Sequence, residues 1–189
     1  MKIFSMKTGL RVASIALLIC TFFVPAAGAM SSTPELERAA GAALSKLYAR
    51  NSKAAEIGRR SVAVLVFPDA HMVAAGVGVQ TATGVLFYKN QSMAYFNLTG
   101  ISAGLELGIR KFDYAIFLEN DEAVDKLYQV GGFEIGVAPT LVIGDGLISG
   151  RVSSLSLRSG VDVFVSSQRG LMISLGFGKA KITEYVPDN

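Results

Sequence analysis

The chain has 189 residues, of which 51% are hydrophobic and 17% charged, so it holds enough apolar material for one domain with a buried core. It contains a single cysteine, Cys20, and a single histidine, His71, which excludes a disulfide framework and a zinc site built on nitrogen or sulfur ligands. The formal net charge of +3 comes from 18 basic and 15 acidic residues.

Residues 1–29 are typical of a secretory signal peptide. A basic start is followed by a mostly apolar stretch over residues 12–24 and by Ala27-Gly28-Ala29, a small-x-small pattern that signal peptidase recognises. We expect cleavage before Met30 and export to the periplasm or the medium. Lipidation at Cys20 is a minor alternative, because the bulky Ile19 stands where a small residue is expected.

Removal of the leader changes the charge. The leader carries three of the 18 basic residues and none of the 15 acidic ones, which leaves 15 of each in a mature chain of 160 residues. A formally neutral chain lacks the overall positive charge that points to nucleic acid. We therefore expect residues 30–189 to form a single domain that has no nucleic-acid partner.

A helix is predicted over residues 33–50. Either Thr33 is the N-cap and Pro34 takes the first helical position, or Ser32 is the N-cap and Glu35 closes a capping box. Apolar residues then recur at helical spacing and form one stripe, which consists of Leu36, Ala40, Ala43, Leu44, Leu47 and Tyr48. This stripe packs either on a sheet or, in the alternative, on a membrane surface. Asn51-Ser52 is expected to end this helix, and a short second helix is expected over residues 53–58.

Residues 61–186 are predicted to form a β-rich core of short strands. Pro68 ends the first apolar run, and glycines recur between the segments that follow. Glycine inside strands marks bulges, bends and close backbone approaches. Near the C-terminus, Gln168-Arg169-Gly170 is expected to be a turn between strands.

Within this core, Leu105, Leu107 and Ile109 are predicted to face one side of a strand, with Glu106 and Arg110 on the other. A short helix that begins after the N-cap Asn120 interrupts the strands. The predicted fold class is therefore α+β with β dominant: a strongly curved or closed antiparallel sheet with an N-terminal helix and one short internal helix.

The sequence does not favour an enzyme. Residues 100–104 match the G-x-S-x-G pattern around a nucleophilic serine, here Ser102. The only histidine, His71, precedes that serine, whereas an α/β-hydrolase requires the acid and then the histidine after it. Neither a phosphate-binding loop nor a complete dinucleotide motif is present. We expect no catalytic centre, no cofactor and no metal.

Basic side chains gather near the N-terminus of the mature chain, where residues 35–60 hold six basic and three acidic residues. Such a run often forms only a solvated face. The alternative is a basic side that binds anionic headgroups, at about 1 kcal/mol for each well-placed cation. The candidate lipid-binding residues are Lys46, Arg50, Lys53, Arg59 and Arg60. Arginine suits bidentate phosphate contact better than lysine does.

The chain resembles the SYLF-domain family over residues 44–186. The resemblance is carried by an ordered set of motifs: Ala63-Val64-Leu65-Val66-Phe67-Pro68, Gly76-x-Gly78, Gly84-Val85-Leu86, Ala94-Tyr95-Phe96-Asn97, Gly100-x-Ser102-x-Gly104-Leu105-x-x-Gly108, Gly131-Gly132 to Gly136, and Arg169-Gly170-Leu171. Glu106 stands where members often carry glutamine, and Phe133 where an aromatic residue, commonly tryptophan, is found.

The resemblance implies a non-enzymatic domain that associates with lipids or membranes, often through basic residues and a helix near its N-terminal end. Eukaryotic members also bind phosphoinositides and actin, and the actin role is not expected of an exported protein. Our first hypothesis is an exported domain that binds anionic lipid headgroups or membrane surfaces. The alternative is a structural protein of the cell envelope that binds a protein partner through an edge strand or its glycine-rich face.

Overall fold

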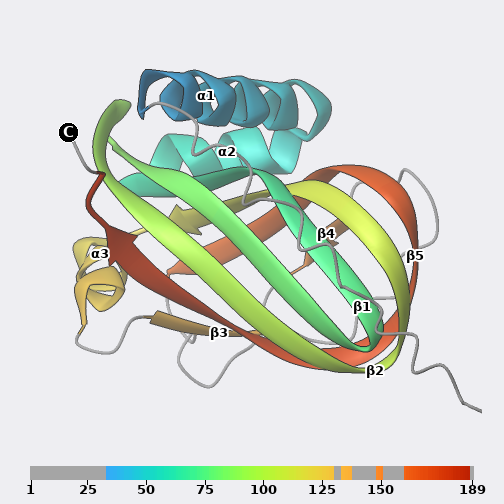
Figure 1. Ribbon diagram of the computed structural model, residues 1–189. Coiled ribbons are helices and arrows are strands. Elements are labelled where there is room, and N and C mark those ends of the chain that lie inside the picture. The colour runs from blue at the N-terminus through green and yellow to red at the C-terminus, as the bar shows by residue number, and fades with distance from the viewer. Residues whose placement is uncertain (1–32, 130–132, 138–147, 151–159, 188–189) are drawn as a thin grey trace, which may run out of the picture. The chain divides into compact units, whose positions relative to one another are not determined.

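The fold is described from a computed structural model, which covers residues 33–129, 133–137, 148–150 and 160–187, all within one compact unit of the chain. The elements in order are α1 (Thr33–Arg50), α2 (Ser52–Arg60), β1 (Ala63–Tyr88), β2 (Gln91–Leu118), α3 (Asp121–Asp125), the 3₁₀ turn η1 (Lys126–Tyr128), β3 (Phe133–Val137), β4 (Ile148–Gly150) and β5 (Val161–Tyr185) (Figure 1). The expected signal peptide lies outside the described residues, as do residues 138–147 and 151–159 of the expected β-rich core.

The predicted fold class is confirmed in its main features. The strands form one antiparallel sheet in the order β1-β2-β5-β3, with β4 paired to β5. Among the described strands no pairing joins β1 to β3, so the sheet is not closed. The N-terminal helix spans the predicted residues 33–50, and Asn120 caps the short internal helix by accepting a hydrogen bond from the Ala123 amide at 2.9 Å.

The strands are much longer than the sequence suggests, with 26, 28 and 25 residues in β1, β2 and β5. Pro68 does not end β1, because a bulge between Phe67 and Ala70 lets the strand continue, with Asp69 at a φ of 53°. The expected turn at Gln168-Arg169-Gly170 is likewise wrong. Gly170 lies inside β5 at a φ of 104° and pairs with Arg110, next to a shift in register.

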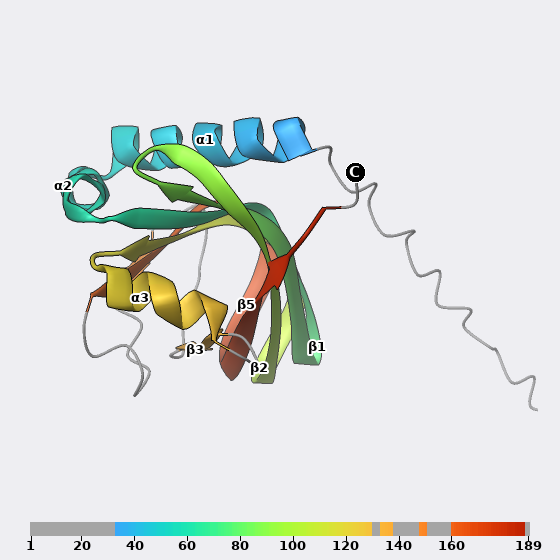
Figure 2. The ribbon, with the colours of Figure 1, turned by 90° about the vertical axis from the view of Figure 1, so that its left-hand side faces the viewer.

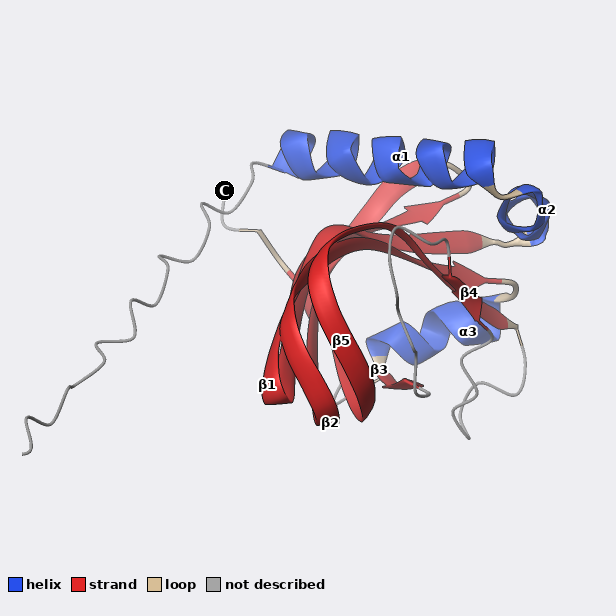
Figure 3. Ribbon diagram, turned by 90° about the vertical axis from the view of Figure 1, so that its right-hand side faces the viewer, coloured by secondary structure: helices blue, strands red, loops and turns tan. Residues whose placement is uncertain are grey.

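The long strands bend strongly along their length (Figure 3). In β1 the bend brings the second half of the strand against the first: a Cβ atom on Gly84 would lie 2.5 Å from both the Phe67 ring and the Val66 carbonyl oxygen. Only glycine allows this approach, which is the use of strand glycine that the sequence predicts. Figures 2 and 3 show the bend at the end of the sheet away from α2.

Two groups of buried side chains cover the two sides of the sheet. The inner group lies within the bend, under α3 and η1, and includes Phe67, Phe96, Phe112 and Ile116. The second group lies between the sheet and the helices α1 and α2, and it is centred on Phe117, whose ring packs against the Phe164 ring at 5.3 Å between centroids. The helices therefore cover only part of one side of the sheet.

Candidate functional site

The predicted basic residues lie on the end of α1 and on α2. Lys46 and Arg50 are one helical turn apart near the end of α1, and Asn51 starts α2 by accepting a hydrogen bond from the Ala54 amide at 3.0 Å. Lys46, Arg50, Lys53 and Arg59 are all exposed, and within the described part of the chain none of them forms an ion pair. These four cations are available to an anionic surface.

Arg60 has a different role from its neighbour. Its guanidinium group donates two hydrogen bonds to Glu119 Oε1, at 2.9 Å from Nε and 2.6 Å from an Nη atom, and lies 3.7 Å from Asp162. These contacts tie the end of α2 to the ends of β2 and β5. The expectation that both arginines are free for phosphate is therefore corrected, because the charge of Arg60 is balanced within the protein.

The apolar stripe of α1 packs on the sheet. Ala40 is fully buried, Leu47 is 2% exposed, and Leu36, Leu44 and Tyr48 are partly buried against the same cluster. The Tyr48 hydroxyl lies so close to Gly58 that a Cβ atom there would be only 2.3 Å away. The alternative in which these five residues face a membrane is therefore wrong for this structure, and any lipid contact by α1 uses its polar face.

A side-chain hydrogen bond also fastens α1 to β2. The Tyr95 hydroxyl donates to Glu37 Oε1 at 2.5 Å. Hydrogen bonds from Tyr95 and Ser92 lower the pKa of Glu37, while burial and then the bond to Glu37 raise the pKa of Tyr95 to about 12. Both shifts favour the pairing of a neutral phenol with a carboxylate over a wide pH range.

We expect Tyr95→Phe to lower the free energy of unfolding by about 1 kcal/mol at pH 7, because Glu37 loses a donor. A carboxyl group whose pKa is lowered by folding stabilises the protein above its ordinary pKa of about 4.5, and this contribution disappears as the pH falls through the folded-state value. Urea unfolding at pH 7 and pH 3 should therefore show a smaller difference between variant and wild type at pH 3. An unchanged difference would contradict the role given to Glu37.

The middle of the long strands presents an exposed apolar surface that the sequence interpretation did not foresee. Its large side chains are 50–76% exposed, and we call them the outer apolar patch: Val73, Val77, Val79, Ile101, Leu105, Leu107 and Ile109. They pair across the strands as Val73–Ile109 and Val79–Ile101. Odd-numbered residues of β2 from Tyr95 to Phe117 share one side of the sheet, so the patch continues the side that α1 covers.

The alternation predicted for residues 105–110 is confirmed. Unlike in an ordinary half-buried strand, the apolar residues face outward and Glu106 faces inward. Leu105 is 76% exposed, whereas Glu106 is 4% exposed on the inner side. There the Ser102 hydroxyl donates to Glu106 Oε2 at 2.5 Å, and the Arg110 guanidinium lies 4.9 Å from the centre of the Phe112 ring. Burial lowers the pKa of Arg110, and the charge of Glu106 acts in the opposite direction.

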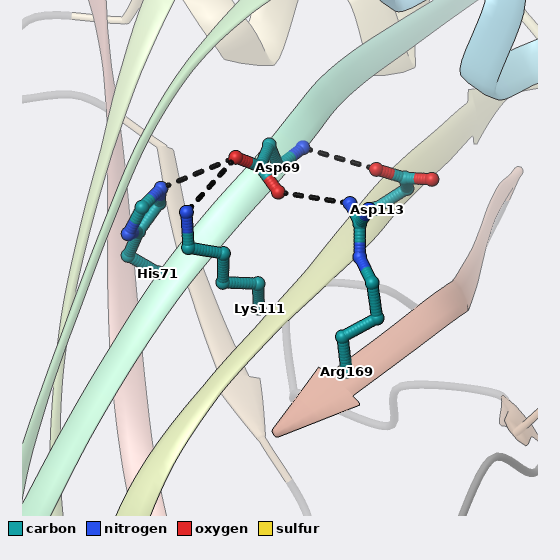
Figure 4. Close-up of polar contacts among 5 residues, drawn as sticks. All are labelled: Asp69, His71, Lys111, Asp113 and Arg169. Atoms are coloured by element: carbon teal, nitrogen blue, oxygen red, sulfur yellow. Dashed lines mark hydrogen bonds and ion pairs between the residues drawn. The ribbon is translucent and has the colours of Figure 1, made fainter.

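Polar groups border the outer apolar patch at both ends. At one end, the carboxylate oxygens of Asp69 lie 3.0–3.4 Å from side-chain nitrogen atoms of His71, Lys111 and Arg169 (Figure 4). The backbone amide of Asp69 donates a hydrogen bond to the Asp113 carboxylate at 3.0 Å. At the other end lies an open groove of about 700 Å³, lined mainly by apolar atoms and by Lys179 and Lys181. The patch is therefore an apolar centre between two polar margins.

The described residues contain no cluster of His, Cys, Asp or Glu side chains that could hold a metal ion. No helix in the described ranges is long and apolar enough to cross a membrane. Neither protein-family models nor curated proteins give a match to the sequence. The resemblance to SYLF domains thus rests on the sequence motifs alone.

Proposed function

We propose that the exported mature chain binds anionic lipid headgroups at a membrane surface through the polar side of α1 and α2. The observation that supports this most is the group of four exposed cations without ion pairs, Lys46, Arg50, Lys53 and Arg59, on two consecutive helices. Each cation near an anionic membrane contributes about 1 kcal/mol, so four give a binding energy that salt screens readily.

Because the apolar stripe of α1 is packed on the sheet, this contact is electrostatic and peripheral. Vesicle flotation tests the proposal directly. The protein should float with vesicles that contain an anionic phospholipid at low salt, and much less with phosphatidylcholine alone or at about 0.5 M salt, where the screening length is only a few ångströms. Equal recovery with both kinds of vesicle would contradict it.

The adjacent arginines provide a matched pair of variants. We expect Arg59→Ala to weaken binding to anionic vesicles about fivefold, the equivalent of roughly 1 kcal/mol, with no change in the thermal midpoint. Arg60→Ala should instead lower the free energy of unfolding by up to about 1 kcal/mol, because it removes the exposed ion pair with Glu119. Its effect on vesicle binding should be the smaller of the two. The reverse order of effects would place Arg60 in the lipid contact.

One observation favours the alternative of a protein partner. In the described part of the sheet β1 pairs only with β2, which leaves part of its other edge without a neighbouring strand. That function predicts a protein that co-purifies with the chain under gentle extraction and binding that does not depend on lipid composition.

A further inference from the structure

The outer apolar patch needs an occupant. Seven large aliphatic side chains, each at least half exposed, lie on one continuous surface of β1 and β2, and Ala75 and Ala103 between them are also exposed. Apolar patches of more than a few hundred Å² are rare on monomeric proteins and mark contact sites. Isolated exposed apolar residues are ordinary, but a cross-strand set of this size is not.

The position of the patch argues against the membrane as its occupant. Figures 2 and 3 show the bend of the long strands at the end of the unit opposite α2. If the cations of α1 and α2 rest on a lipid surface, the bend points away from that surface. The exclusion of the membrane rests on the proposed function. With the membrane excluded, the partner of the patch is another protein surface.

We propose that the outer apolar patch is the interface between two copies of this chain. Burying a fully exposed Val, Leu or Ile side chain corresponds to roughly 60–120 Å² of apolar surface, so seven side chains that are 50–76% exposed offer up to about 500 Å² per copy. Two copies would bury up to about 1,000 Å² of apolar surface, which reaches the lower bound for a specific interface. A symmetric pair needs no second kind of surface, because the same patch serves both copies.

The surroundings of the patch fit this arrangement. Protein interfaces have an apolar centre without charges and a polar rim. Here the exposed side chains between residues 73–79 and 101–109 are apolar, while Asp69, Lys111 and Arg169 lie at one margin and Lys179 and Lys181 at the other. Leu105 is the most exposed member, and an open groove lies beside Ile101 and Ala103 on the same surface.

Light scattering coupled to size-exclusion chromatography of the purified protein, without lipid, tests the pairing. We expect the wild type to have twice the monomer mass. Leu105→Asp with Leu107→Asp should raise the dimer dissociation constant about 100-fold or more, since both copies lose two central contacts. Met93→Asp is the matched control: Met93 is 63% exposed but lies outside the patch, and its variant should remain dimeric. A monomeric wild type, or loss of the dimer in the control alone, overturns the proposal.

A fluorescence experiment gives an answer that does not depend on the charged variant. The sequence has no tryptophan, so Leu105→Trp creates a single reporter in the patch, and Met93→Trp one outside it. Tryptophan emission at position 105 should shift to the blue as protein concentration rises, and at position 93 it should not. Quenching of the reporter at 105 by brominated acyl chains would instead assign the patch to lipid and overturn the dimer. Because neither measurement of the pairing uses lipid, failure of headgroup binding leaves the result on the dimer unaffected.

Discussion

Phe117→Ala is expected to lower the free energy of unfolding by about 3–5 kcal/mol, the usual cost of removing a fully buried aromatic side chain. Phe117 is fully buried and its ring contacts Tyr48 of α1 and Phe164 of β5, at 6.1 and 5.3 Å between centroids. Among the described residues, no other aromatic ring contacts both Tyr48 and Phe164. We therefore expect the cavity left by the missing ring to loosen the packing of α1 on the sheet.

Urea unfolding measures the loss, and Phe117→Leu is its control. Leucine keeps the site apolar and fills most of the volume, so we expect it to cost no more than about half as much. The alanine variant should also expose α1 and α2 to proteolysis earlier than the strands, since those helices pack on the sheet through this cluster. A loss below about 1 kcal/mol would mean that the helices do not depend on Phe117.

The helices were predictable because their signals are local. Thr33, Pro34 and a stripe of apolar residues indicate where α1 begins and which face is buried. The side chains of Asn51 and Asn120 cap α2 and α3 by accepting hydrogen bonds from the backbone amides three residues later in the chain. A cap and a period of 3.6 residues lie within a few positions of one another, so the sequence shows them directly. The apolar stripe shows that α1 has a partner, and only the structure shows that this partner is the sheet.

The lengths of the strands could not be read in the same way. Gly170 was expected in a turn, but it lies in a strand with a positive φ, and a Cβ atom there would come within 2.4 Å of the Ile109 carbonyl oxygen. Turns and bulges both use glycine in this conformation, so the local sequence does not separate them. The pairing with β2, about sixty residues earlier in the chain, decides between the two.

The candidate site was predicted in part for a related reason. Basic residues on α1 and α2 are exposed as expected, but the bond from Arg60 to Glu119 joins positions 59 residues apart, and no pattern around Arg60 announces it. For Leu105 and Glu106 the predicted alternation is confirmed, and the structure adds that Leu105 faces outward and Glu106 inward. Period-2 patterns show which residues share a face of a strand, but they do not show which of the two faces is buried.

Glu106→Ala is expected to lower the free energy of unfolding by about 3 kcal/mol, because Ser102 loses its hydrogen-bond acceptor and the partly buried Arg110 loses a negative charge that favours its charged form. Glu106 is 4% exposed, accepts the hydrogen bond from Ser102, and is the negative charge that opposes the lowering of the Arg110 pKa by burial. Within the described residues Arg110 Nε is buried without a hydrogen-bond partner, so this side chain has little to replace the lost carboxylate.

Glu106→Gln is the control for charge, and it places there the residue that SYLF-domain members often carry. Glutamine keeps an oxygen that accepts from Ser102 at 2.5 Å and fills the same space, which Gly78 leaves open by having no Cβ. We expect it to cost only about 1 kcal/mol, the net value of one hydrogen bond. Urea unfolding of the two variants at pH 7 gives the comparison. If the alanine and glutamine variants lower the free energy of unfolding equally, the charge of Glu106 does not stabilise Arg110. If neither variant lowers it, the contacts among Ser102, Glu106 and Arg110 do not stabilise the fold.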